Sequence, residues 1–596
     1  MTQIQERRLR RTQTLVRLAL VGLIASVLPR VGLAVDRFVP GAFPTIQAAI
    51  NASASGDRVF VAPGTYIGSV DFLGRSIAVI GTDGPAVTTV AIGSLGSVVI
   101  IDQASDPLST RLEGFTVTGG SGQLVGNPPS LAGGAVFVSE SSPTIENCVF
   151  SGNNATLGGA IFLDLSSAQI LNCEFSGNLG SEGGAILAVD SEPRISGSTF
   201  TANQAFGRGG AIHLTRCPAE IIDCIFTGNE AARGGALSFA DNSDGEITDC
   251  LVADNIAFEH GGGISLDQFS DAIISAVSCI GNVAASGGGI GITHFSQAIL
   301  TDVDIRENTA GEGGGVRIFE SCPFLDRVVI RGNSADGSAG GSGEGGGIYM
   351  QLRADTILRN CIIAENSSVL AGGGVFIRWK CEPLFVHTVI ADNQAGTEGG
   401  AIGLDNYSVP AIWNSILWGN TAPMFPAIAL DPESSFDLHF TDIEGGAPGG
   451  AILDVDPNFT VDYRLEVCSP VIDQGSTGAP QFPAVDIDGN PRVQGVAPDL
   501  GAAETPAGSG ICFVRGDVND DSSIDIGDVT ASLGWLFDNV ALPCRDAADV
   551  DDSGVIDIAD PIATLSYLFS NGAPPPPPEL STPAPDPTAD TLGCGE

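Results

Sequence analysis

The chain has 596 residues and a formal net charge of −44, although only 16% of its residues are charged. Such an excess of acidic groups disfavours nucleic acids and anionic membranes as partners, and it favours solubility and cation binding. The chain contains a single lysine, Lys380.

The first residues, 1–34, are typical of a signal peptide. Five arginines precede the apolar run at residues 18–28, and Gly32-Leu33-Ala34 offers a small-residue cleavage site. A membrane anchor is the alternative, but Pro29 and Arg30 keep the apolar run below about 18 residues. We therefore expect a secreted protein, extracellular or at the cell surface, with no membrane span after signal cleavage.

The next domain, which we assign to residues 37–505, begins with a short amphipathic helix. Residues 43–56 read Phe-Pro-Thr-Ile-Gln-Ala-Ala-Ile-Asn-Ala-Ser-Ala-Ser-Gly. We expect this N-terminal cap helix to plug the open end of a coil of strands. An irregular C-terminal end is expected near residues 469–504.

An internal repeat dominates residues 133–401. Gly-Gly followed by Ala, Ile or Val occurs eleven times, at spacings between 25 and 32 residues. A period of this length indicates a solenoid, propeller or array whose units are stable only when stacked. The apolar stretches between the glycines are short, alternating and β-branched, and a helix of ten residues does not fit between the turns. The sequence therefore predicts an all-β solenoid, a parallel β-helix with three short strands per coil.

A column of asparagines runs in step with the glycines. We expect its side chains to stack as a ladder at one turn, where Asn tolerates a left-handed backbone. The Gly pairs are expected to mark a bend that needs positive φ or close backbone approach. Eleven equivalent positions argue for structure rather than catalysis. The column consists of Asn153, Asn178, Asn203, Asn229, Asn255, Asn282, Asn308, Asn333, Asn366, Asn393 and Asn420.

The strand after each Gly pair predicts which side faces the core. In the later coils the first and third residues stay apolar, as at Ile264 and Leu266, whereas the second and fourth are polar or mixed, as at Ser265 and Asp267. With a period of two, the first set faces inward. The early coils are ambiguous, because their second and fourth residues are apolar as well, which suggests an outer face that is covered or makes contacts.

Most of the 13 cysteines are expected to be small, buried and unpaired. Bridges between adjacent coils are the alternative. Cys512 and Cys544 flank the first acidic loop of the C-terminal region and form the bridge that we expect. One inward column, shared with Ser, Val and Thr, holds Cys148, Cys173, Cys224, Cys250 and Cys361. A second column, on coils too far apart to pair, holds Cys217, Cys322 and Cys381.

Three short segments and the coils carry a resemblance to a known family. The segments are residues 45–50 (Thr-Ile-Gln-Ala-Ala-Ile), Gly56-Asp57 and residues 61–66 (Val-Ala-Pro-Gly-Thr-Tyr). Together they resemble secreted right-handed parallel β-helix proteins of the pectin-lyase-like fold, and the coils also look like repeats of polymorphic outer-membrane proteins. The resemblance covers residues 40–505, and it implies a right-handed coil and elongated polymers, such as polysaccharides, as ligands.

Residues 512–570 change character and contain the same acidic loop twice, 32 residues apart. Positions 1, 3, 5, 9 and 12 of each loop carry oxygen side chains, and position 7 offers its backbone carbonyl, as a hard cation requires. Each loop runs into an apolar helix, at residues 529–537 and 562–569. The predicted ligands of two Ca²⁺ ions are Asp517, Asn519, Asp521, Ser523, Asp525 and Asp528 in the first loop, and Asp549, Asp551, Ser553, Val555, Asp557 and Asp560 in the second.

The duplicated loop and helix resemble a type I dockerin, a small α-helical module with EF-hand-like calcium loops. The resemblance implies two bound Ca²⁺ ions and docking to a cohesin-like protein. The chain departs from the family at Ser522, where position 6 is expected to be Gly, and at Ser553, which weakens position 5. Residues 571–596 follow as a Pro-rich tail, which we expect to be extended or disordered.

A basic and aromatic patch is predicted on the outer face of coils eight to ten. Rings stack on sugars and arginines bind uronate carboxylates, so this patch is the candidate carbohydrate groove, with a solvated mixed face as the alternative. The 32-residue coil lies beside it. No residue is singled out as catalytic. The candidates are Arg317, Phe319, Tyr349, Phe376, Arg378, Trp379 and Lys380.

Three functions are compatible with these features. The one we adopt is a secreted, polysaccharide-associated protein, binding or processing carbohydrate, that is tethered by a calcium-dependent dockerin-like module. A non-catalytic cell-surface or adhesion rod is favoured by the near-uniform coils. A polysaccharide lyase or glycoside hydrolase is disfavoured, because no long loop insertion builds a wall around a cleft. Enzymatic activity is left open.

Overall fold

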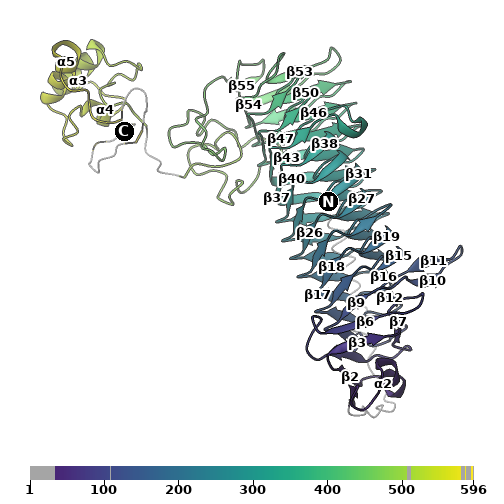
Figure 1. Ribbon diagram of the computed structural model, residues 1–596. Coiled ribbons are helices and arrows are strands. Elements are labelled where there is room, and N and C mark those ends of the chain that lie inside the picture. The colour runs from purple at the N-terminus through teal and green to yellow at the C-terminus, as the bar shows by residue number, and fades with distance from the viewer. Residues whose placement is uncertain are drawn as a thin grey trace, which may run out of the picture.

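A computed structural model describes residues 34–107, 109–506, 512–578, 584–585, 592 and 594. Apart from Ala34, the predicted signal peptide lies outside these residues. The chain winds into a long parallel β-solenoid, followed by a small helical module at its C-terminal end (Figure 1). Within the described residues, no helix is long and apolar enough to cross a membrane.

Three sheets run along the solenoid, and nearly all their strands pair in parallel, as predicted. Sheet A has 29 strands, and most coils give it two short strands: β1 (Asp36–Val39), β2 (Arg58–Val61), β3 (Gly64–Ile67), β5 (Ala78–Gly81), β6 (Thr88–Ala91), β8 (Arg111–Glu113), β9 (Thr116–Thr118), β13 (Thr144–Glu146), β14 (Val149–Ser151), β17 (Gln169–Leu171), β18 (Glu174–Ser176), β21 (Arg194–Ser196), β22 (Thr199–Thr201), β25 (Glu220–Ile222), β26 (Ile225–Thr227), β29 (Glu246–Thr248), β30 (Leu251–Ala253), β33 (Ile273–Ser275), β34 (Ser278–Ile280), β37 (Ile299–Arg306), β40 (Phe324–Arg331), β43 (Ile357–Arg359), β44 (Ile362–Ala364), β47 (Leu384–Val386), β48 (Val389–Ala391), β51 (Ala411–Trp413), β52 (Ile416–Trp418), β54 (Asp437–Ile443) and β55 (Gly450–Leu453).

Sheets B and C complete each coil. Sheet B has 14 strands: β4 (Val70–Asp71), β7 (Val99–Asp102), β12 (Val136–Ser139), β16 (Ile161–Asp164), β20 (Ile186–Val189), β24 (Ile212–Thr215), β28 (Leu237–Ala240), β32 (Ile264–Leu266), β36 (Ile290–Thr293), β39 (Val316–Phe319), β42 (Ile348–Gln351), β46 (Val375–Arg378), β50 (Ile402–Asp405) and β53 (Ile428–Leu430). Sheet C has 12 strands: β10 (Gln123–Val125), β11 (Ser130–Ala132), β15 (Asn154–Leu157), β19 (Leu179–Glu182), β23 (Gln204–Ala205), β27 (Glu230–Arg233), β31 (Ile256–His260), β35 (Val283–Ser286), β38 (Thr309–Glu312), β41 (Ser334–Ala335), β45 (Ser367–Ser368) and β49 (Gln394–Ala395).

The asparagine column forms the predicted ladder at the turn from sheet A to sheet C. Asn229 donates from its backbone N and from Nδ2 to Oδ1 of Asn255, both at 2.9 Å, and Asn255 does the same to Asn282. The expectation of a left-handed Asn is wrong, because positive φ falls on the residue before it, such as Gly228 (61°). Asn is suited to the column because its buried amide can donate and accept along the axis.

The glycines behave as predicted, and they also explain the ambiguous early coils. The first Gly of each group has positive φ, as at Gly158 (64°), and a Cβ on Gly159 would lie 2.1 Å from the carbonyl oxygen of Gly184. Leu237 pairs with Ile264, so the third Gly of a later coil stands where an early coil has Ala. The inward residues are therefore the same in every coil, and the ambiguity came from a register error of one residue.

The buried cysteines stay unpaired, as expected, and share their columns with serine. The backbone N of Ser191 lies 3.3 Å from Sγ of Cys217, whose own N donates to Oγ of Ser243. Cys322 does not belong to this column, contrary to the prediction. Ser321 takes the inward place there, and Cys322 is exposed. The cause is a turn that is one residue short.

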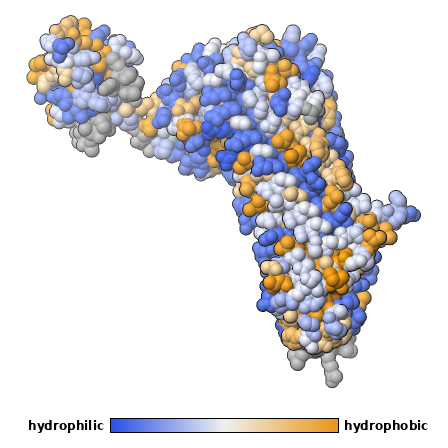
Figure 2. Space-filling view, viewed as in Figure 1, coloured by the Kyte–Doolittle hydropathy of each residue, from blue (hydrophilic) through white to orange (hydrophobic). Residues whose placement is uncertain are grey.

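The ends of the solenoid differ. Helix α2 (Ile46–Ala52) lies within the segment 43–56 where a cap helix is expected, and it buries Ile46 and Ile50 in the first coils. Residues 455–506, here called the C-terminal cover, lack regular strands and lie against the outer face of sheet A (Figure 1). Arg492 holds the cover: it is fully buried, donates to Asn360 Oδ1 at 2.8 Å and pairs with Glu504 at 3.1 Å. Figure 2 shows mainly hydrophilic residues on this part of the surface.

A 3₁₀ turn, η1 (Ser338–Gly340), lies in the enlarged coil of the solenoid. The C-terminal module contains three helices: α3 (Ile526–Asp538), α4 (Arg545–Ala548) and α5 (Ala559–Ser570). The predicted Cys512–Cys544 bridge is wrong. Cys512 pairs with Cys468 of the C-terminal cover, and Cys544 pairs with Cys594 of the tail. The tail is therefore tied to the module rather than free, and the spacing of cysteines along the chain could not reveal partners 44 and 50 residues away.

Candidate functional site

Sheet B carries two rows of outward side chains, and the first row is buried, except for the half-buried Arg317, although it points away from the core. Residues that end sheet C cover it: Arg317 of β39 pairs with Glu312 of β38 at 3.0 Å, and a Cβ on Gly291 would lie 3.4 Å from the His260 ring. Sheets B and C therefore meet at a concave corner, here called the B–C corner. The first row comprises Phe162, Leu187, His213, Ser238, Ser265, Gly291, Arg317, Tyr349, Phe376 and Gly403.

The middle of the B–C corner holds a buried carboxylate, Asp267, which follows β32 and is 1% exposed. Its Oδ1 accepts from His294 Nδ1 at 2.8 Å and from Thr293 Oγ1 at 3.1 Å. Its Oδ2 lies 3.3 Å from Arg208 Nη2 and 3.5 Å from Arg233 Nη1. Because a carboxylate oxygen can only accept, His294 carries its proton on Nδ1, and Nε2 is left as the basic atom.

Burial and neighbouring charges shift the pKa values of Asp267 and His260 at this centre. Burial alone would raise the pKa of Asp267, but the hydrogen bond from His294 and the neighbouring His260, Thr293 and Arg208 lower it, so Asp267 is ionised. Burial, aided by Arg233, lowers the pKa of His260 to about 4, so this ring is neutral near pH 7. Among the described residues, His260 Nε2 and the buried hydroxyl of Ser265 have no hydrogen-bond partner.

A second group of charges lies farther along the same corner. Burial, with the charges of Asp405 and Glu312 nearby, raises the pKa of Glu344. Arg378 lies 3.8 Å from Glu344 and 3.0 Å from Asp405. A carboxyl group with a raised pKa beside a second carboxyl group is one feature that glycoside hydrolysis uses.

The seven predicted carbohydrate residues do not form one open patch. Tyr349 and Phe376 are 1% and 5% exposed and stack on each other at 5.7 Å, so their faces are closed to a sugar. Arg317 and Arg378 are ion-paired, and Arg317 also lies 5.0 Å over the ring of Phe319. Trp379 and Lys380 lie apart from the others and line a cavity, which has a volume of about 650 Å³ and lies at the turn after sheet B.

Sequence reasoning missed the centre at Asp267, although one signal was present. Asp267 and His294 are 27 residues apart, about one coil, which places them on neighbouring strands. The histidines instead looked scattered. Arg208 and Arg233 could not be found in this way, because they reach the corner from sheet C.

The two acidic loops of the C-terminal module have matching local structure. Asp517 accepts from the backbone N of Asp521 and Ser522, at 3.0 and 2.9 Å, and Asp549 accepts from Ser553 and Gly554, at 3.0 and 2.7 Å. Position 6 is left-handed in both loops, with φ of 65° at Ser522 and 80° at Gly554. In the second loop, carboxylate oxygens of Asp549, Asp551 and Asp560 lie within 4.8 Å of one another.

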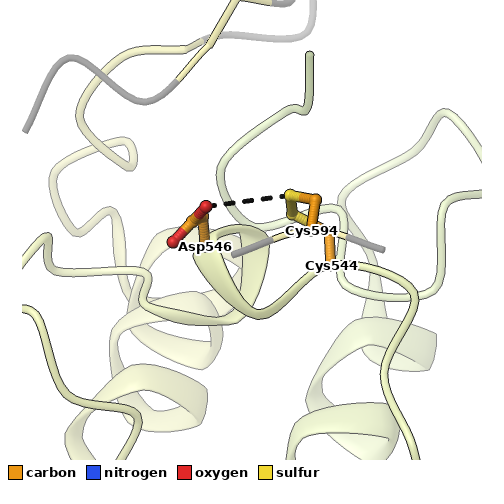
Figure 3. A group of neighbouring side chains, drawn as sticks. All are labelled: Cys544, Asp546 and Cys594. Carbon is orange, nitrogen blue, oxygen red and sulfur yellow. Dashed lines mark hydrogen bonds between the residues drawn. A yellow bond between two sulfur atoms is a disulfide. The ribbon is translucent and has the colours of Figure 1, made fainter. Parts of the chain in front are cut away.

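A different group in the module resembles a metal site but is not one. Cys544, Asp546 and Cys594 lie together, as Figure 3 shows. The two sulfur atoms are bonded to each other, so neither is a thiolate that could bind a cation.

The fold places the chain among known proteins. A family profile described as "Right handed beta helix region" matches residues 98–238 and 235–422, which together make up more than half of the chain. The chain belongs to the right-handed β-helix family. No curated protein sequence matches this β-helix protein.

Several solved structures are similar to this β-helix protein at low sequence identity. The periplasmic alginate epimerase AlgG has a TM-score of 0.36 and 12% identity, covering 65% of this chain and 84% of its own. Pectate lyase Pel9A has a TM-score of 0.31 and 11% identity, covering 79% and 97%. The catalytic domain of a GH87 α-1,3-glucanase in complex with nigerose has a TM-score of 0.30 and 11% identity, covering 70% and 69%.

Proposed function

We propose that this right-handed β-helix protein is secreted, binds an extended polysaccharide across the outer face of sheet B, and processes it at Asp267 and His294. One observation carries the proposal: a fully buried carboxylate on an outer face is held by four charged or polar groups from neighbouring coils. A rod needs no such group, and buried charges with shifted pKa values cluster at functional sites.

His294 is the base in this proposal. Its Nδ1–H is engaged by Asp267, which orients the ring, and about half of the side chain is exposed, so Nε2 can reach a ligand. On a uronate residue, Nε2 would take the proton at C5 while the bond from C4 to the leaving oxygen breaks and that oxygen takes a proton from water, which leaves a double bond between C4 and C5. The nearby arginines Arg208 and Arg233 add positive potential to the same corner.

Hydrolysis is the second candidate, and it is favoured by the raised pKa of Glu344. Glu344 would donate a proton to the leaving oxygen, and Glu312, paired with Arg317 at 3.0 Å, would act as the second carboxyl group. The two reactions differ in product, because only elimination creates an unsaturated end.

The assay uses the full chain without residues 1–34, on polygalacturonate, alginate and a neutral glucan. Ultraviolet absorbance follows unsaturated ends, and reducing ends follow all cleavage. We expect His294→Ala to lower elimination at least 100-fold. His439→Ala is the matched control, since His439 forms an Asp–His pair with Asp437 at 3.0 Å away from the B–C corner. Elimination that survives His294→Ala contradicts the base, and binding without cleavage makes the protein a carbohydrate-binding rod.

We further propose that the C-terminal module binds two Ca²⁺ ions and tethers the protein to a cohesin-like partner. The support is the duplication: both loops place oxygen side chains at the same positions and share the left-handed residue at position 6. Calorimetric titration of the full chain should give two Ca²⁺ per chain, and Asp560→Asn should remove one. A stoichiometry of zero in the unaltered chain would rule out the tether as proposed.

A further inference from the structure

The turn after sheet B is one residue shorter in the coil of Glu320 than in the coils on either side of it, and it has there the short form found in the early coils. Coils on either side pass through two consecutive left-handed residues, such as His294 and Phe295 before it and Leu352 and Arg353 after it. The intervening coil has only Glu320 in this conformation. Glu320 and Cys322 of that coil still contact Phe295 and Arg353 through the backbone, but the coil has one residue fewer at this turn, and a notch opens there.

The cavity of about 650 Å³ occupies this notch. Its walls include three rings that remain accessible: Phe295, Trp379 and Tyr407 are 53%, 40% and 57% exposed. The volume lies within the range of about 300–1,000 Å³ that ligand pockets occupy. Exposed rings lining a concave site, rather than a flat surface, suit a ligand with apolar faces, such as a pyranose ring.

The two basic residues that line the notch lack, in the described structure, the carboxylate partners that Arg317 and Arg378 of sheet B have. Arg353 and Lys380 line the cavity, and within the described part of the chain neither forms an ion pair with a carboxylate. Arg317 and Arg378, on the same face, are both ion-paired. Lys380 instead lies 5.8 Å over the ring of Tyr407. Glu320 is the one acidic residue among the described residues that line this cavity, so Arg353 and Lys380 leave it with an excess of positive charge. In a protein with a net charge of −44, that excess beside open rings indicates an anionic ligand.

We propose that the notch binds a hexuronate residue of a polysaccharide, with the sugar ring on Trp379 and its carboxylate between Arg353 and Lys380. This inference rests on the proposed function and specifies its substrate class. Phe295 follows His294 directly in the chain, so a polymer seated in the notch continues toward the base at the end of β36. The notch acts as a specificity site beside the reaction centre.

Binding of tetragalacturonate and of cellotetraose to the full chain without residues 1–34 tests the proposal. The double variant Arg353→Gln/Lys380→Gln should weaken tetragalacturonate at least tenfold and leave cellotetraose unchanged. Trp379→Ala should weaken both. Arg216→Gln is the matched control, because Arg216 is a left-handed residue of the same turn in an earlier coil and lies outside the notch. Equal tetragalacturonate affinity in the double variant and the control would overturn the proposal.

A second readout locates the ligand. Cys322 lines the notch and is exposed, whereas the other unpaired cysteines are buried. Tetragalacturonate should therefore slow maleimide labelling of Cys322, and cellotetraose should do so less. Unchanged labelling at saturating tetragalacturonate places the ligand elsewhere and contradicts the notch.

Closing the notch provides a test that does not remove a charge. Inserting one asparagine after Glu320 restores the two-residue turn of the neighbouring coils, so folding should be retained and tetragalacturonate binding lost. Retained binding contradicts the proposal. Loss of notch binding with surviving elimination would leave the proposed function standing, whereas loss of all polysaccharide binding and cleavage in the unaltered chain would reject both.

Discussion

The inside of the solenoid and the outer face of sheet B follow opposite rules. Inside, Asn occupies the same place from Asn153 to Asn420, and Phe150, Phe175, Phe200 and Phe226 stack at 4.6–4.9 Å. Outside, the first row passes from Phe to His, Ser, Gly, Arg and Tyr within a few coils. Stacking requires each inward residue to match its neighbours, whereas an outward residue is free to change from coil to coil. A residue type that occurs in one coil alone therefore indicates function only on the outer face.

Removing one side chain of the inward asparagine ladder should have the largest effect on the free energy of unfolding. In Asn255→Ala, the backbone N and Nδ2 of Asn229 lose their shared acceptor, and the Phe226 carbonyl loses a donor at 3.0 Å. Buried groups left without partners cost about 1–3 kcal/mol each, so we expect a loss of roughly 3–5 kcal/mol in unfolding free energy. Denaturant titration measures it. Asn154→Ala, at the exposed neighbouring position, is the control, and equal losses in both would contradict the ladder.

Lowering the pH should reduce the stability of the protein through buried histidines outside the inward columns. Burial lowers the pKa of His213 to about 3 and that of His260 to about 4. The unfolded chain takes up these protons near pH 6.5, and the folded chain does not, so stability falls as the pH drops from about 6.5 toward 4. Each ring adds a slope of up to about 1.4 kcal/mol per pH unit. His213→Asn should flatten the pH profile of unfolding free energy, and an unchanged slope would contradict the buried neutral ring.

The charged centre should be more important for chemistry than for stability. Asp267→Asn keeps the size of the side chain and one acceptor, and Arg208 and Arg233 retain contact with solvent. We expect a stability loss of about 1–2 kcal/mol. The amide oxygen should face the donors Arg208 and Arg233, which turns the NH2 group toward His294. Elimination should then fall at least 100-fold, because His294 no longer carries its proton on Nδ1. Asp190→Asn is the control: this exposed carboxylate pairs with Arg216 at 2.6 Å and should change neither quantity by much. A loss of stability without a loss of elimination would make Asp267 structural.

The same contrast explains what could be predicted from the sequence. The Asn and Gly columns repeat, so the coil, the inward side and the unpaired cysteines followed from their period. The site residues do not repeat. Arg208, Arg233 and Asp267 come from different sheets, and their meeting depends on the angle between sheets B and C, which no spacing encodes. Cys468 and Cys594 were missed as partners for a related reason, because long-range pairing depends on where the cover and the tail lie.

The smallest effect that we predict concerns the C-terminal module. Its acidic loop occurs twice, so the residue at one position of a loop can be replaced by the residue at the same position of the other loop. Ser522 and Gly554 occupy the same position with φ of 65° and 80°. A left-handed backbone is unfavourable for Ser by about 1 kcal/mol and not for Gly, although Gly also makes the unfolded chain more flexible. Ser522→Gly should therefore stabilise the module by a few tenths to about 1 kcal/mol and tighten Ca²⁺ binding to the first loop alone. Gly554→Ser should do the reverse in the second loop, as followed by thermal unfolding with and without Ca²⁺. Equal effects of opposite sign would mean that the two loops are equivalent units, whereas a destabilising Ser522→Gly would mean that the serine side chain has a role that the duplication does not explain.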